Sequence, residues 1–138
     1  MRIAGVVIGI FCAHVAGWAA DGTWIAGSGA WTNTANWTAA SLPGAGDKAF
    51  FTGAGGTIDA VSATLKALEF NATSNAVDWT LNGAGVSLVA PAEVSIATAN
   101  EAVLAVPVAG SAGLTKKGPG YLLLSGSNTV SGALRVEG

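Results

Sequence analysis

The sequence predicts an all-β fold in which short strands stack as coils of a parallel β-helix, or solenoid. The composition favours this class, because 20 glycines recur along the chain and good helix formers such as Lys and Arg are scarce. Only 10% of the residues are charged, against roughly 25% in an average soluble domain. Apolar and polar residues also alternate in short runs separated by Gly, Asn and Ser, which is typical of half-buried strands joined by turns.

Residues 1–19 are predicted to be a secretory signal peptide. Arg2 supplies a single positive charge, and residues 3–16 form an apolar stretch of 14 residues, shorter than the ~20 that a membrane-spanning helix needs. Gly17 and Ala19 are small residues at positions −3 and −1 relative to a cleavage site before Ala20. We therefore expect cleavage before Ala20 and a secreted protein, extracellular or on the outer cell surface, with an uncleaved anchor as the alternative.

Cleavage would remove Cys12, His14 and Met1, the only cysteine, histidine and methionine of the sequence. The mature chain then lacks the usual general base and thiol nucleophile. Its carboxylates are scattered singly, without the spacing of a metal site or the facing pair of a glycosidase. Five basic and eight acidic residues remain, for a net charge of −3. We therefore expect no enzyme activity, no metal, no cofactor and no nucleic-acid partner.

Residues 20–47 are rich in Trp, Gly and Asn, and we predict that they form an N-terminal cap. An open β-helix ends in a raw sheet edge and an apolar interior, which large aromatic side chains cover well. We interpret Trp24, Trp31 and Trp37, which look exposed in the sequence, as the rings of this cap. The alternative is that these rings form a platform for contact with a glycan, as in a carbohydrate-binding module.

Residues 48–138 are predicted to form the coils. In the stretch VDWTLN, Val77, Trp79 and Leu81 would face the core, and Asp78 and Thr80 would face outward. The same alternation places on the core side Val86, Leu88, Val94, Ile96, Leu104, Val106, Val108, Leu134 and Val136. Turns are expected at Asn82-Gly83, at Gly110, and at residues 118–120 and 126–128.

Four leucines, Leu104, Leu114, Leu124 and Leu134, recur at ten-residue intervals. Ten residues are too few to close a coil around a packed interior, whereas two such segments, about 20 residues, fit one coil. We therefore expect Leu104 to stack on Leu124, and Leu114 to stack on Leu134. Leu123, one residue out of step, should point away from the core.

The stretch GLTKKGPGYLLLSGSNTVSG, within a repeat at residues 111–138, resembles the autotransporter-associated β-strand repeat. The positions that match this repeat are Gly113, Leu114, Thr115, Lys116, Gly118, Gly120, Leu122, Leu124, Ser125, Gly126, Asn128, Thr129 and Gly132. The closing turn departs from the pattern, because Val130 replaces the usual Tyr and Ala133-Leu134 replace the usual Gly-Thr-Thr. The Trp-rich start is similar to that of long secreted bacterial proteins with such repeats.

This resemblance implies a right-handed parallel β-helix of about 4–5 coils. It also implies a non-enzymatic passenger segment, displayed at or released from a bacterial surface, with adhesion as one role open to it. The implied partners are an extracellular glycan or a host or cell-surface molecule, and a membrane is reached only through a downstream translocator. A carbohydrate-binding module and a β-helix enzyme that degrades polysaccharides are the alternatives.

The stretch KKGPGY is not a nucleotide-binding loop. A strand, YLLLSG, follows it, rather than the helix whose N-terminus would meet the phosphates. We expect Lys116 and Lys117 to lie at a solvated turn without a ligand. Pro119 followed by Gly120 predicts a type II turn in which Gly120 takes a positive φ. Asn128 is expected either to bond its own backbone in a turn or to stack on an Asn of the next coil.

Overall fold

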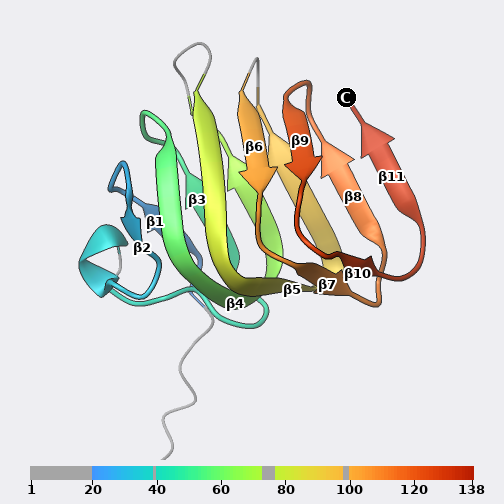
Figure 1. The fold of residues 1–138 in the computed structure, drawn as a ribbon, viewed down its shortest axis with the longest axis horizontal. Coiled ribbons are helices and arrows are strands. Elements are labelled where there is room, and N and C mark those ends of the chain that lie inside the picture. Colours follow the sequence, from blue (N-terminus) through green and yellow to red (C-terminus); the bar gives the residue numbers. More distant parts are fainter. Residues whose placement is uncertain (1–19, 39, 73–76, 98–99) are drawn as a thin grey trace, which may run out of the picture.

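A computed structural model describes residues 20–38, 40–72, 77–97 and 100–138 of the chain. Within these ranges the chain is a parallel β-solenoid of about four turns, which confirms the predicted all-β fold class (Figure 1). The predicted signal peptide, residues 1–19, lies outside the described residues.

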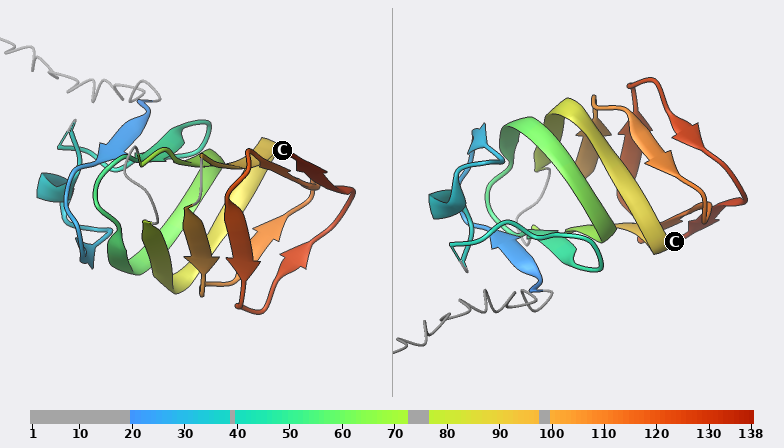
Figure 2. Two further views of the ribbon diagram at one scale, coloured as in Figure 1. Left: turned by 90° about the horizontal axis from the view of Figure 1, so that it is seen from above. Right: turned by 90° about the horizontal axis from the view of Figure 1, so that it is seen from below.

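Eleven strands and one short 3-10 helix make up the described fold. The N-terminal end holds β1 (Gly22–Trp24), β2 (Gly29–Ala30) and η1 (Thr34–Asn36). The chain continues through β3 (Lys48–Phe51) and two long strands, β4 (Gly56–Phe70) and β5 (Asp78–Ile96). Six short strands complete it: β6 (Glu101–Leu104), β7 (Val108–Gly110), β8 (Leu114–Lys117), β9 (Tyr121–Leu124), β10 (Thr129–Val130) and β11 (Leu134–Glu137). Figure 2 shows the turns side by side along the long axis, with η1 at one end and β11 at the other.

Three rows of parallel strand pairs run along the solenoid, and each row forms one face. The ion-pair face consists of β1, β3, residues 67–70 and 93–96, β8 and β11. The leucine face consists of β2, residues 56–58 and 78–81, β6 and β9. The hydroxyl face consists of residues 62–65 and 85–88, β7 and β10.

The strand register confirms the coil length that the leucine spacing predicts. Leu104 pairs with Leu124, 20 residues further along the chain. Leu114 pairs with Leu134 in the same way. The preceding turn is longer, at 23 residues, because Leu81 pairs with Leu104. The ten-residue interval therefore separates strands on different faces, and two intervals make one full turn.

The long strand β5 bends from face to face instead of stopping at a turn. The turn expected at Asn82-Gly83 is therefore wrong, because β5 continues through it. Gly83 and Gly85 lie at the bend with φ of 148° and 151°, a conformation that favours glycine. A Cβ atom on Gly83 would overlap the backbone of Val61 in the preceding turn. Glycine at this corner thus lets two turns stack closely without breaking the strand.

The interior is one continuous apolar core, and the alternation predicts its members correctly through most of the chain. Val77, Trp79 and Leu81 are buried, whereas Asp78 is exposed. The other predicted core residues of the middle turns are also buried: Val86, Leu88, Val94, Ile96, Leu104, Val106 and Val108. Burial of an apolar side chain contributes roughly 25 cal/mol per Å² of area removed from water, so this shared core holds the turns together.

The last turn is the exception to this burial. Leu134 and Val136 are 70% and 81% exposed, although both were expected in the core. They lie on β11, which pairs with β8 on one side only in the described chain. Leu124 was likewise expected to be stacked between coils, but it is only half-buried, because it has Leu104 on one side and no described strand on the other.

An aromatic cluster closes the opposite, N-terminal end of the core. Trp37 packs edge-on against Trp24 and Trp31, with ring centroids 5.2 Å and 4.6 Å apart. Phe51 connects these rings to the next turn, because it lies 6.3 Å from Trp37 and stacks on Phe70 at 4.6 Å. We call these five residues the aromatic plug.

Candidate functional site

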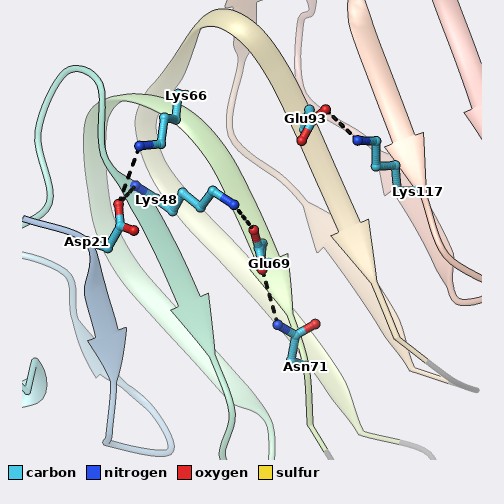
Figure 3. A network of polar contacts seen from close by, with 7 residues as sticks. All are labelled: Asp21, Lys48, Lys66, Glu69, Asn71, Glu93 and Lys117. Atoms are coloured by element: carbon cyan, nitrogen blue, oxygen red, sulfur yellow. Dashed lines mark hydrogen bonds and ion pairs between the residues drawn. The ribbon is translucent and has the colours of Figure 1, made fainter.

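Charged side chains gather on the ion-pair face, where they connect successive turns (Figure 3). The strands of this face present alternate residues to solvent and to the core. Glu69, for example, lies between Leu68 and Phe70, which are both buried. The charged groups therefore form a surface network above an apolar interior.

The first part of this network surrounds Lys48. Its Nζ lies 2.6 Å from Oε1 of Glu69 in the next turn, and Nδ2 of Asn71 donates to the other carboxylate oxygen of Glu69 at 3.3 Å. Asp21 receives a hydrogen bond of 2.8 Å from the backbone N–H of Lys48. Nζ of Lys66 lies 3.7 Å from the same oxygen of Asp21. Two lysines and two carboxylates thus link the first three turns.

The second part joins Lys117 to Glu93, with Nζ and Oε1 2.5 Å apart. The expectation that Lys116 and Lys117 lie at a turn is wrong, because both belong to β8. They point to opposite sides of this strand. Lys117 faces outward to Glu93, whereas Lys116 is in register with buried Val94 and its Nζ donates to the carbonyl oxygen of Gly118.

The ion pairs raise the pKa of the two outward lysines. The hydrogen bond to Glu69, together with the charge of that carboxylate, raises the pKa of Lys48 above its ordinary value. The hydrogen bond to Glu93 likewise raises the pKa of Lys117. A lysine is an ammonium ion at neutral pH even at its ordinary pKa of 10.5, and these pairs keep both amines charged to higher pH. Each ammonium ion is bonded to a carboxylate of another turn, so the network binds turns together.

The sequence contains a signal for these pairs that strand alternation alone does not use. Lys48 and Glu69 are 21 residues apart, and Glu93 and Lys117 are 24 apart. Both separations are close to one turn of the solenoid, so opposite charges one coil apart meet on the same face. A search for charges at the coil period would have found both pairs.

Glycines of the repeat motif lie where neighbouring turns approach most closely. Gly113, Gly118 and Gly132 have φ of 82°, 78° and 98°. A Cβ on Gly113 would overlap the carbonyl oxygen of Ala133, and one on Gly126 would overlap that of Val106. Gly126 needs glycine for close backbone contact, and Gly113, Gly118 and Gly132 need it for their left-handed φ as well. Their role is structural.

The turn at residues 118–120 differs from the predicted type II turn. Gly118 takes the positive φ of 78°, and Gly120 is not among the residues with positive φ. The reason is the ladder to the previous turn. The N–H of Gly120 donates to the carbonyl oxygen of Ile96 at 3.1 Å, which holds Gly120 in line for β9. The change of direction therefore falls on Gly118, the residue that follows β8.

Other motif residues follow the alternation of their strands. Leu114 is buried and Leu122 is half-buried on the core side, while Thr115 points outward, and Ser125 and Thr129 are exposed. None of them contacts a group that suggests a ligand. We assign these five residues to the coil itself.

Two asparagines connect the turns from inside the bends. Oδ1 of Asn128 accepts from the N–H of Val108 in the preceding turn at 3.0 Å, and its Nδ2 donates to the carbonyl oxygen of Leu124 at 3.5 Å. The longer bond is to the backbone of the same turn, four residues back, and the shorter bond crosses to the preceding turn. Asn100, which the sequence reading did not single out, is fully buried and accepts from the N–H of Val77 at 3.2 Å.

The three tryptophans of the cap segment are buried, with exposures of 0%, 1% and 2% for Trp24, Trp31 and Trp37. The alternative of a glycan platform needs exposed rings, and these rings are buried. Two of their indole N–H groups are also engaged, since Trp24 donates to the carbonyl oxygen of Gly27 and Trp37 to that of Trp31. No ring face is left for a sugar to stack on, because each is covered by the plug.

An open depression of about 360 Å³ lies on the hydroxyl face. Its lining contains small side chains and no ionisable group: Ser62, Ala63, Thr64, Ala84, Gly85, Val86, Ser87, Pro107 and Ala109. Across the described ranges, no three His, Cys, Asp or Glu side chains are grouped to hold a metal ion. Among the residues that the structure describes, no helix is long and apolar enough to cross a membrane.

Comparison with protein-family models, with curated proteins and with solved structures finds no match to this chain. The resemblance of residues 111–138 to the autotransporter-associated repeat therefore stays a prediction. On the ion-pair face, lysines of one turn are paired with carboxylates of another turn. This face therefore holds neighbouring turns together.

Proposed function

We propose that this chain is a non-enzymatic structural segment of a secreted bacterial protein of the autotransporter type. Its role is to form a stiff, protease-resistant rod that presents loops at or beyond the outer cell surface. This proposal rests on the partners of the charged side chains of the ion-pair face. Lys48, Glu69, Glu93 and Lys117 bond from turn to turn and not toward a cavity.

The physical basis of such a rod is the parallel stack. Each strand is hydrogen-bonded to the corresponding strand of the next turn, about 4.8 Å away along the axis. Each turn contacts only its neighbours, so the length of the rod grows with the number of turns while the cross-section stays the same. Proteases need an extended segment, and a backbone committed to such ladders offers few of them.

The two alternative functions have less support. A carbohydrate-binding module would need the rings of Trp24, Trp31 and Trp37, and these are covered. A β-helix enzyme could use Glu69 and Glu93, but each of these carboxylates is bonded to a lysine. The proposal therefore keeps an extracellular glycan or cell-surface molecule as a partner only for the loops, and a membrane only through a downstream translocator.

Secretion is tested by expressing the full chain in a secreting bacterial host and sequencing the N-terminus of the exported protein. We expect it to begin at Ala20 or close to it, because Gly17 and Ala19 satisfy the small-residue requirement of a signal peptidase. An exported protein that still begins with Met1 would contradict the signal-peptide part of the proposal.

The structural role is tested by limited proteolysis together with a panel of polysaccharides. We expect the folded chain to resist a broad-specificity protease far longer than the urea-unfolded chain, and to hydrolyse no polysaccharide in the panel. Hydrolysis that disappears in Glu69→Gln but persists in Asp78→Asn, an exposed carboxylate of the leucine face, would overturn the non-enzymatic assignment. Degradation of the folded chain at the rate of the unfolded chain would overturn the rod.

A further inference from the structure

The hydroxyl face differs from the other two faces because its described strands contain no charged residue. Residues 62–65 and 85–88, β7 and β10 consist of apolar residues, Ser, Thr and Gly. The ion-pair face holds the lysine–carboxylate pairs, and the leucine face holds Asp78 and Glu101. The hydroxyl face runs along the side of the stack, where β7 and β10 are labelled in Figure 1, so its accessibility does not depend on where the stack ends.

The depression of about 360 Å³ lies on this face and spans three turns. Ser87, in its lining, is in register with Thr64 of the preceding turn and with Ala109 of the next turn. Gly85 lies beside Ser87 and has no side chain, so the middle of the depression is low. The depression can therefore receive an uncharged group, with hydroxyls at hand to donate or accept hydrogen bonds.

An apolar ridge borders the depression where β5 bends from the hydroxyl face toward the ion-pair face. At this corner Lys66 of β4 alone stands opposite residues 89–92 of β5, so β5 has more chain there than the preceding turn. The extra chain is turned outward. Val89 is 37% exposed, and Ala90 and Pro91 are exposed as well. We call residues 89–91 the ridge.

The ridge and the depression lie next to each other on one strand. Ser87 and Val89 are two residues apart in β5, so both side chains point to the same side, roughly 6–7 Å apart along the strand. A two-fold axis that passes between them, parallel to the long axis of the solenoid, would place Val89 of each copy over Ser87 of the other. Such a contact is isologous and closes as a dimer.

We propose that the hydroxyl face binds the hydroxyl face of a second copy of this chain, with the ridge of each copy in the depression of the other. The occupant is a second copy because one surface carries both the ridge and the depression that receives it. The ridge leaves water on contact, and an uncharged surface of this kind is typical of the core of a protein interface.

This pairing goes beyond the proposed rod and is compatible with it. Because the two-fold axis is parallel to the stack, the two solenoids lie side by side and point in the same direction. Rods that extend from one cell surface have this arrangement, and further turns would lengthen both rods without moving the contact.

Charged groups at the edges of the hydroxyl face have partners away from the contact. Lys66 lies at the corner one turn before the ridge, and its Nζ is 3.7 Å from the carboxylate of Asp21 on the ion-pair face. Glu93, which follows the ridge region, is paired with Lys117. At the opposite edge, Asp59 accepts an amide hydrogen bond of 3.2 Å. The dimer therefore buries no unpaired charge.

The proposal is tested by the oligomeric state of the chain as the secreting host exports it, measured by sedimentation equilibrium over a wide range of concentration. We expect a concentration-dependent dimer. Ser87→Lys and Val89→Asp should each weaken dimerisation by about tenfold or more, because each places an unpaired charge in the contact. Thr80→Lys, at an outward position of the same strand on the leucine face, is the matched control and should leave the dimer unchanged.

A mixture of Ser87→Lys and Val89→Asp chains gives the sharpest result. In a heterodimer the new lysine of one chain meets the new aspartate of the other, and the second ridge and depression are wild type. The mixture should therefore dimerise more tightly than either variant alone, which pairing within one chain could not produce. Circular dichroism of each variant checks that the β-fold is retained.

Several results would overturn the proposal. They are a monomeric wild-type chain, dimers that persist in both variants, a control that disrupts the dimer as strongly as Ser87→Lys, and a mixture without rescue. A monomeric chain that binds a neutral polysaccharide through this face would make the depression a ligand site instead. A monomeric chain that still resists protease would overturn the dimer and leave the proposed rod intact.

Discussion

The first and last described turns of the solenoid differ in how far their apolar side chains are exposed. At the N-terminal end, Trp24, Trp31 and Trp37 are at most 2% exposed. At the C-terminal end, Leu134 and Val136 are at least 70% exposed. Both groups lie at the limit of the stack, so the difference is not one of position. Within the described chain, the aromatic plug covers the first turns, whereas the apolar side chains of the last described turn are exposed.

The difference shows that a residue's contribution in a solenoid depends on how many turns flank it. An inward-facing side chain between two turns loses nearly all contact with water. One on a terminal turn gains only part of that free energy, because half of its environment is missing. Large aromatic rings compensate at the N-terminal end, since each of them covers more area than an aliphatic side chain.

The largest expected effect contrasts the ends directly. Trp37→Ala should destabilise the chain by about 3–5 kcal/mol, because it removes the centre of the aromatic plug and leaves a cavity. Val136→Ala, at the exposed end, should change the free energy of unfolding by no more than about 0.5 kcal/mol. Urea denaturation followed by tryptophan fluorescence and circular dichroism measures both. Equal losses would mean that the two ends are not different in kind.

The second contrast uses one leucine column. Leu104→Ala should cost about 2–5 kcal/mol, because this side chain is fully buried between Leu81 and Leu124. Leu124→Ala should cost about 1–2 kcal/mol, because its outer side is open. Thermal and chemical unfolding of the two variants decides the matter. A larger loss at Leu124 would contradict the half-burial of this side chain in the described chain.

Glycine substitutions separate backbone strain from contact between turns. Gly46 and Gly118 have similar φ, 89° and 78°, but a Cβ on Gly46 would meet nothing within 4 Å, whereas one on Gly118 would overlap the Ile96 carbonyl. Gly46→Ala should cost about 1 kcal/mol from strain alone. Gly118→Ala should cost about 1–3 kcal/mol more, and the difference in unfolding free energy isolates the contact. Similar values for both variants would argue against close stacking of these turns.

The smallest effect concerns an ion pair near the closed end. Lys48→Met should lower stability by about 0.2–1 kcal/mol at neutral pH, because a solvent-screened pair contributes little. The pKa of Lys48 is raised in the folded state, so this contribution is present below the ordinary value of 10.5 and is lost as pH rises through the folded value. Denaturation at neutral and strongly alkaline pH should show the gap between wild type and variant closing. A gap that widens at alkaline pH would contradict the assigned sign.

Much of the coil could be predicted from local pattern. The alternation of Val77, Trp79 and Leu81 identifies the core side of a strand, because side chains of a strand point to opposite faces in turn. The ten-residue spacing of leucines correctly predicts that Leu104 pairs with Leu124. The alternation spans a few residues and the leucine spacing has a fixed period, so both can be recognised in the sequence alone.

The burial of each side chain and its hydrogen-bond partners depend on which residues of the neighbouring turn lie opposite it. Trp31 is enclosed by Trp37 and Phe51, and Val136 is open, although both are apolar side chains in terminal segments. The positive φ falls on Gly118 and not on Gly120, because the N–H of Gly120 is held by Ile96 in the previous turn. Strand alternation says which side of the backbone a side chain occupies, but exposure and turn geometry follow from the distance to atoms about 20 residues away in the chain, which only the stacked turns bring together.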